Sequence, residues 1–132
     1  MRPTYSVIIA GGRTFNDYDL LAQSCDHYLS DKFDTHNIEI VSGTANGADK
    51  LGELYSAEIE LAEITKNSLK RFPANWDKYG NSAGYKRNKQ MAKHADALIA
   101  FWDGASRGTM HMINIMNDLD KPVRVVKYKE AV

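Results

Sequence analysis

The chain has 132 residues, which is within the size range of one domain and enough to enclose a hydrophobic core. Lysine and arginine together number 17, as do aspartate and glutamate, and this balance argues against a general nucleic-acid-binding protein. The single cysteine, Cys25, excludes an intrachain disulfide and a cysteine zinc cluster, so we expect it to pack in the core. No apolar run approaches the ~20 residues that span a bilayer. We therefore expect a cytoplasmic protein with one domain over residues 1–132 and no membrane partner.

Short apolar runs alternate with amphipathic segments along the whole chain. Continuous apolar and β-branched runs predict strands at 6–10, 38–43, 68–72, 97–102 and 122–128. Apolar residues at helical spacing predict helices at 18–29, 48–64, 84–95 and 109–119. The segment 73–83 has no regular pattern, and we expect it to be irregular.

Five strands joined by four crossovers predict an α/β fold. Right-handed crossovers between parallel strands favour a three-layer Rossmann-like sandwich with a five-stranded, mostly parallel sheet. The expected strand order is 3-2-1-4-5. This order places the first and fourth strands side by side and forms a ligand crevice at their carboxyl ends.

Glycine-rich turns follow the first, second and fourth predicted strands, with the sequences AGGRTF, SGTANGAD and WDGASRGT. Glycine lets backbone N–H groups approach a ligand closely, and a helix N-terminus attracts anions. One such turn is weak evidence, because glycine is common between strand and helix. Three such turns on one rim of the sheet favour a phosphate-binding site.

The turn after the fourth strand has two compatible interpretations. Ser106 is placed to cap the last helix, with its hydroxyl toward the N–H of Thr109. A phosphate site would use the same cap and add the amides of Gly108 and Thr109 and the Thr109 hydroxyl. Arg107 would supply positive charge.

The helix predicted at 84–95 begins with cations, an arrangement that opposes the helix dipole. An anionic ligand near Arg87 and Asn88 would explain this arrangement, and Arg13 is expected to face the same rim. The guanidinium group suits a phosphate or carboxylate better than lysine does. Trp76 and Tyr79 would either stack on a base or cover the core.

No catalytic motif is present in the sequence. Asp49 and Asp103 are the carboxylates nearest the predicted rim, and His111 lies one helical turn beyond SRGT, where it could reach a ligand. These three are weak catalytic candidates. Asp49 could equally cap its helix or place a negative charge at the N-terminus of that helix. We expect no metal site and no cofactor.

The segments VIIAGGR, VSGTANGAD, FPANWDKYGNSAGYKRNKQM, ADALIAFWDGASRGTMHMI and KPVRVV occur in this order and cover nearly the whole chain. Together they resemble the YspA-like branch of the SLOG superfamily. The resemblance implies a Rossmann-like sheet with a pocket for a nucleotide or a nucleotide derivative. The wider superfamily includes cytokinin-activating phosphoribohydrolases, DprA and sensor domains for NAD-derived signals. Carried over residue by residue, the implied ligand-binding positions are Gly11, Gly12, Arg13, Ser42, Gly43, Gly47, Ala48, Asp49, Trp76, Arg87, Asn88, Gly104, Ser106, Arg107, Gly108 and Thr109.

One departure from the resembled phosphoribohydrolases concerns catalysis. Those enzymes carry PGGxGTxxE, whose glutamate helps to cleave the N-glycosidic bond, whereas this chain has Met112 at the equivalent place, beside His111. A methionine cannot act as an acid or a base, so binding is favoured over catalysis.

The predicted function is therefore to bind a phosphorylated nucleotide or an NAD-derived, ADP-ribose-like molecule, as a sensor or a sequestering protein. Sequestration of an immune signal by a phage protein is one such role. The alternative is a hydrolase that cleaves an N-glycosidic or phosphoester bond, and single-stranded DNA binding is a more distant one. The helix at 48–64 is longer than expected for this branch, and we expect a homo-oligomer, a dimer or higher.

Overall fold

The computed structural model describes residues 2–66 and 68–129, and in these residues the strands form a parallel sheet in the order β3-β2-β1-β4-β5. Its strands are Thr4–Gly11 (β1), Asn37–Ser42 (β2), Leu69–Arg71 (β3), Ala97–Trp102 (β4) and Val123–Lys127 (β5). Each neighbouring pair is parallel, and β1 lies beside β4 with Gly11 opposite Phe101. The predicted α/β Rossmann-like fold and strand order are confirmed.

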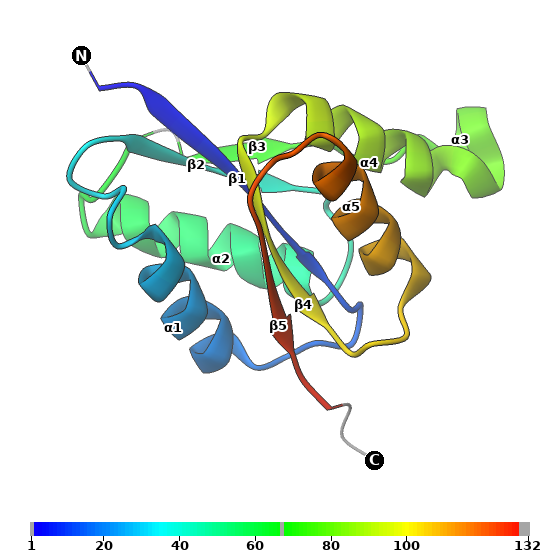
Figure 1. Ribbon diagram of the computed structural model, residues 1–132, viewed down its shortest axis with the longest axis horizontal. Helices are drawn as coiled ribbons and strands as arrows, with labels where there is room; N and C mark the ends of the chain where they lie inside the picture. Colours follow the sequence, from blue (N-terminus) through cyan, green and yellow to red (C-terminus); the bar gives the residue numbers. More distant parts are fainter. Residues whose placement is uncertain (1, 67, 130–132) are drawn as a thin grey trace.

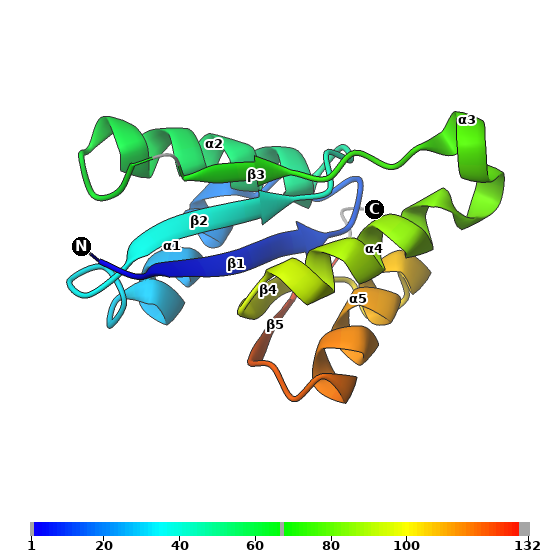
Figure 2. The same ribbon diagram turned by 90° about the horizontal axis from the view of Figure 1, so that it is seen from above.

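Helices cover both faces of this sheet. Those of 12 or 14 residues are Tyr18–Leu29 (α1), Ala48–Leu61 (α2), Ala83–His94 (α4) and Arg107–Asp118 (α5). Figures 1 and 2 show α1 and α2 on one face and α4 and α5 on the other, which gives three layers. Among the described residues, no helix is both long enough and apolar enough to cross a membrane.

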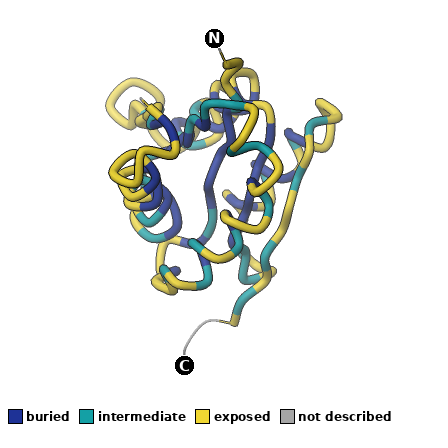
Figure 3. The backbone as a smooth tube through the Cα atoms, turned by 90° about the vertical axis from the view of Figure 1, so that its left-hand side faces the viewer, coloured by how far each residue is buried: buried dark blue, intermediate teal, exposed yellow. Residues whose placement is uncertain are grey.

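The burial of β1 explains its continuous apolar sequence. Val7 and Ile9 pack in the cluster with α1 and α2, whereas Ile8 and Ala10 pack in the cluster with α4 and α5. A strand covered on both faces has no polar side, so its residues do not alternate in character. Figure 3 shows the buried segments gathered inside the molecule and the exposed ones outside. Cys25 is fully buried, as predicted.

The structure differs from the prediction in one segment and at several element boundaries; for example, β1 begins at Thr4, two residues earlier than predicted. The segment expected to be irregular contains a short helix, Trp76–Tyr79 (α3), and a 3-10 turn, Gly80–Ser82 (η1). The helix expected to reach residue 64 ends at Leu61, because Glu63 takes a positive φ of 60° and turns the chain. The last helix begins at Arg107, two residues earlier than predicted.

Candidate functional site

The loops after β1 and β2 are joined to each other and to β4 by their backbones. The Gly12 N–H donates to the Phe101 carbonyl at 3.1 Å, and the Gly12 carbonyl accepts from the Ala48 N–H at 3.2 Å. A Cβ on Gly11 would lie 2.2 Å from the Phe101 oxygen. Gly47 has a φ of +79°, and a Cβ there would lie 2.2 Å from the Gly12 oxygen. These glycines permit the close approach that brings the loops together at one rim.

A cleft of about 380 Å³ opens where these loops meet the N-terminus of α5. The predicted residues that line it are Gly11, Gly12, Arg13, Asp49, Arg87, Asn88, Asp103, Ser106, Gly108 and Thr109. Its other walls are Ala10, Thr14, Ala45, Met91 and Met112. The cleft lies at the carboxyl ends of β1 and β4, where open α/β sheets bind ligands.

Asp49 is a buried carboxyl group in the wall of the cleft. Its side chain is 6% exposed, and its Oδ2 accepts a hydrogen bond from the Ala45 N–H at 3.1 Å. Burial raises the pKa of Asp49 to about 6, although the Ala45 hydrogen bond and the charge of Arg87 oppose this shift. Asp49 is thus a group that changes protonation near neutral pH.

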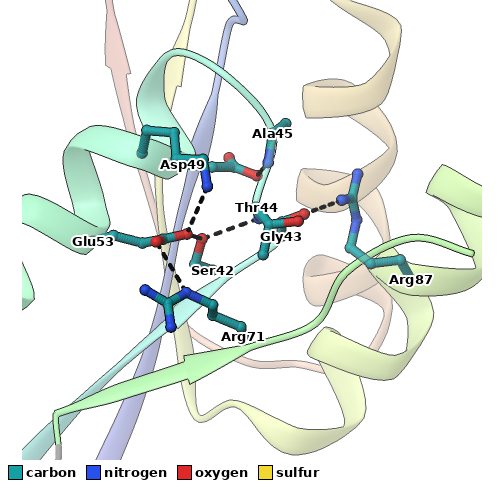
Figure 4. A network of polar contacts seen from close by, with 9 residues as sticks. Ser42, Gly43, Thr44, Ala45, Asp49, Glu53, Arg71 and Arg87 are labelled. Atoms are coloured by element: carbon teal, nitrogen blue, oxygen red, sulfur yellow. Dashed lines mark hydrogen bonds and ion pairs between the residues drawn. The ribbon is translucent and has the colours of Figure 1, made fainter.

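Arg87 reaches from α4 to the loop after β2 (Figure 4). Its Nη1 donates to the Gly43 carbonyl, and its Nε donates to Asn88 Oδ1 at 3.1 Å. A Cβ on Gly43 would lie 2.8 Å from Asp49 Oδ2 and 2.9 Å from Arg87 Nη1, so a larger residue there would displace these two side chains. The ion pairs among the described residues include neither Arg87 nor Arg13. Both arginines bring positive charge to the cleft, where they interact electrostatically with the nearby Asp49.

Hydrogen bonds hold both the oxygen and the nitrogen of the Asn88 side-chain amide. Its Nδ2 donates to the Gly108 carbonyl at 3.3 Å and lies 3.1 Å from His111 Nδ1. Because an amide nitrogen only donates, His111 Nδ1 accepts and the ring is neutral. Burial lowers the pKa of His111, and the charge of Lys89 lowers it further. His111 does not line the cleft; it positions Asn88, which does.

The predicted cap of α5 by the Ser106 hydroxyl was wrong. Ser106 is the N-cap residue, but its hydroxyl lies 3.2 Å from Thr109 Oγ1 and does not bond a backbone N–H. Asp103 holds the turn instead, because its Oδ1 accepts from the N–H groups of Ala105 and Ser106, both at 2.8 Å. These two hydrogen bonds hold the pKa of Asp103 below its usual value. Asp103 is thus an ionised structural group and is poorly suited to act as an acid.

Several predicted residues lie outside the walls of the cleft: Ser42, Gly43, Gly47, Ala48, Trp76, Gly104, Arg107 and His111. Gly43 and Trp76 line an adjoining cavity, together with Arg13 and Arg87.

Ser42 supports the loop after β2 (Figure 4). Its hydroxyl donates to Glu53 Oε2 at 2.7 Å and accepts from the Thr44 N–H at 3.1 Å. Glu53 also pairs with Arg71 at 3.0 Å. Thr44 takes a positive φ of 66°, a conformation that costs free energy in a residue with a side chain. The two hydrogen bonds of the buried Ser42 stabilise this turn.

Sequence reasoning missed Ala10, Thr14, Ala45, Met91 and Met112 as cleft walls. Ala10, Thr14 and Ala45 belong to the glycine-rich turns AGGRTF and SGTANGAD, so their position in these turns is the available signal. Met91 and Met112 lie on the apolar stripes of α4 and α5, where a side chain facing a ligand cannot be distinguished from one facing the core.

The fold and cleft define a Rossmann-like α/β protein whose glycine-rich loops surround a cleft lined by two arginines and two aspartates. The family model of YAcAr, the YspA, cpYpsA-related SLOG family, matches residues 5–79, from β1 through α3. The chain belongs to this family, and membership indicates a nucleotide-related ligand that is bound or processed. No curated protein matches the chain.

Proposed function

We propose that the protein binds a phosphorylated nucleotide or an NAD-derived molecule of the ADP-ribose type, as a sensor or a sequestering protein. The observation that carries this proposal is the placement of Arg13 and Arg87 opposite the start of α5 in one cleft. Guanidinium groups bind phosphate through paired N–H donors, and a helix N-terminus attracts anions. The first turn of α5 has no side-chain cap, and its Gly108 and Thr109 line the cleft.

The remaining polar walls suit the sugar of a nucleotide. Asp49, Asn88 and Thr109 are all at least nine-tenths buried and all line the cleft. The Asp49 carboxylate can accept from sugar hydroxyls, and the Thr109 hydroxyl can both donate and accept, whereas Asn88 holds Arg87 and the start of α5 in place. Membership in the SLOG family supports the same class of ligand.

Binding without turnover is favoured by the residue at the position of the phosphoribohydrolase glutamate. Met112 lies in the cleft wall and is 1% exposed, and it has no proton to give or take. Sequestration of a signal molecule, for instance by a phage protein that counters host defence, requires no turnover.

A hydrolase is the second candidate, and one observation favours it. Asp49 combines burial, a raised pKa of about 6 and a place in the cleft wall. A carboxyl group with these properties can act as a general acid or base near neutral pH. The bond cleaved would be N-glycosidic or phosphoester.

Ligand recovery separates these two functions. The protein is incubated with ADP-ribose, NAD or AMP, its melting temperature is measured, and the ligand is then released by heat and analysed. We expect a rise in melting temperature and intact ligand, because a ligand at 100 times its Kd adds about 2.7 kcal/mol to stability. Free base or ribose phosphate among the products would establish the hydrolase. No rise with any of the three compounds would contradict nucleotide binding.

A further inference from the structure

Two further cavities open beside the cleft. One, of about 420 Å³, borders the loop after β2, and the other, of about 220 Å³, borders the start of α4. Arg13 and Arg87 line both of them as well as the cleft. The two arginines therefore stand where the three cavities meet. A phosphate held there could carry an organic group on each side.

The charges of these arginines favour an anion at this junction. Arg87 uses Nη1 and Nε to bond Gly43 and Asn88, and neither bond involves its Nη2. Burial lowers the pKa of Arg87, Asp49 opposes that shift, and the charge of Arg13 adds to it. Arg13 and Arg87 repel each other, and neither forms an ion pair among the described residues, so a bound phosphate would stabilise both.

The inner and outer cavities differ in chemistry. The inner cleft has buried hydrogen-bonding groups, among them Asp49 and Thr109. Trp76 lines both outer cavities and is 50% exposed. A Cβ on Gly84 would lie 3.5 Å from Trp76 Cη2, which places the indole ring over the start of α4. The inner side suits a sugar, and the exposed indole suits an aromatic base.

We propose that the ligand has two arms joined by phosphate. The sugar arm lies in the inner cleft, the phosphate on Arg13 and Arg87, and the aromatic base against Trp76. This inference rests on the proposed function and narrows it to a nucleotide whose phosphate carries a second sugar.

Calorimetric titration with three probes tests this arrangement. ADP-ribose has both arms, AMP has the phosphate and the base arm, and ribose 5-phosphate has the phosphate and the sugar arm. We expect ADP-ribose to bind at least ~10-fold more tightly than either half, because it fills both sides of the junction.

Variants of the two sides should have separate effects. Trp76→Ala should weaken ADP-ribose and AMP about 5- to 150-fold, the range found for loss of base stacking, and leave ribose 5-phosphate unchanged. Asp49→Asn also removes a negative charge beside Arg87, so its effect is compared between probes: it should weaken ADP-ribose and ribose 5-phosphate about 10-fold relative to AMP. Tyr79→Ala is the matched control, because Tyr79 is an exposed aromatic of the same short helix that lines none of these cavities, and it should change nothing.

The outcomes distinguish this inference from the proposed function. Equal affinity for AMP and ADP-ribose, or an equal effect of Trp76→Ala on all three probes, would overturn the two-armed arrangement and leave nucleotide binding intact. Absence of binding by all three probes would overturn nucleotide binding itself.

A fluorescence measurement covers the case in which Trp76→Ala fails to fold. The chain has two tryptophans, Trp76 and Trp102. ADP-ribose should quench the tryptophan emission of the wild type far more than that of Trp76→Phe, which keeps an aromatic ring. Equal quenching in both proteins would place the base away from Trp76 and overturn the inference.

Discussion

The loop after β2 and the turn after β4 flank the same cleft, but carboxylates in opposite environments hold them. Asp49 is buried, and burial raises its pKa to about 6. Asp103 lies at the surface, where hydrogen bonds from Ala105 and Ser106 lower its pKa. The first loop is also joined to the loop after β1 through the bond from Ala48 to Gly12.

The loop after β2 is therefore held by contacts with other parts of the protein, whereas the turn after β4 is held by hydrogen bonds between its own residues. Arg87 depends on the loop after β2, because it donates to the Gly43 carbonyl. The turn after β4 is held within a few residues, by Asp103 and by a 3.1 Å hydrogen bond from Trp102 Nε1 to the Ser106 carbonyl. Substitutions in the loop after β2 should lower both the stability of the protein and its affinity for ligand. Substitutions in the turn after β4 should have smaller effects, confined to that turn.

The largest expected effect comes from substituting the glycines of the two segments. Gly47→Ala should lower the free energy of unfolding by about 3 kcal/mol or more, because φ is positive and the Cβ would meet the Gly12 oxygen at 2.2 Å. Gly104 has a φ of +89° but nothing within 4 Å of its Cβ. Gly104→Ala should therefore cost only the backbone strain, about 1 kcal/mol. Urea unfolding measures both, and equal losses would contradict the comparison.

The two carboxylates should respond to pH with opposite sign. The pKa of Asp49 is raised in the folded state, so the folded state binds more protons than the unfolded state between about pH 4 and pH 6. Its contribution to stability is complete below pH 4 and is lost as the pH rises through 6. Asp49→Asn should thus stabilise the protein at pH 8 by up to about 3 kcal/mol, and this gain should vanish at pH 4.

Asp103→Asn provides the opposite case. The pKa of Asp103 is lowered, so its contribution is present at neutral pH and is lost as the pH falls through its folded value. The variant should be less stable than the wild type at pH 7, with a difference that shrinks in acid. Thermal unfolding from pH 3 to pH 8 measures both variants. If both variants changed stability in the same direction at neutral pH, the environments assigned to Asp49 and Asp103 would be contradicted.

Replacing the serines of the two segments should change the free energy of unfolding by smaller amounts, and the two changes should differ. Ser42→Ala removes two hydrogen bonds and leaves the Thr44 N–H without its partner, which should cost about 1–2 kcal/mol. Ser106→Ala should cost less than about 0.5 kcal/mol, because the Ser106 hydroxyl does not cap α5. A loss of stability near 1 kcal/mol for Ser106→Ala would instead indicate that the Ser106 hydroxyl caps α5, as the sequence predicts.

Sequence patterns predicted the sheet and the rim well, because both depend on local signals. A strand such as β1, buried on both faces, has a continuous apolar sequence, and glycine marks close approaches such as that of Gly47 to Gly12. Right-handed crossovers then restrict the strand order.

Features that depend on competition between neighbouring groups were not predictable. Ser106 has the residue type of a cap, but the Asp103 carboxylate three residues earlier takes the backbone N–H groups of the turn. His111 has the residue type of a catalytic group, but Asn88 engages its Nδ1. The short helix α3 is too brief to show a period, and only the acceptance by Asn75 Oδ1 from the Lys78 N–H marks its start.

The central claim is that Arg13 and Arg87 hold a ligand phosphate in the cleft. Its most direct test is the Kd of ADP-ribose for the wild type, for Arg13→Gln and for Arg124→Gln, measured by calorimetry. Arg13 is exposed and lines the cleft, whereas Arg124 is an exposed arginine of β5 that does not line it. We expect Arg13→Gln to raise the Kd about 10- to 150-fold, the loss of a charged hydrogen bond, and Arg124→Gln to leave it unchanged. Equal affinity for all three proteins would contradict the claim.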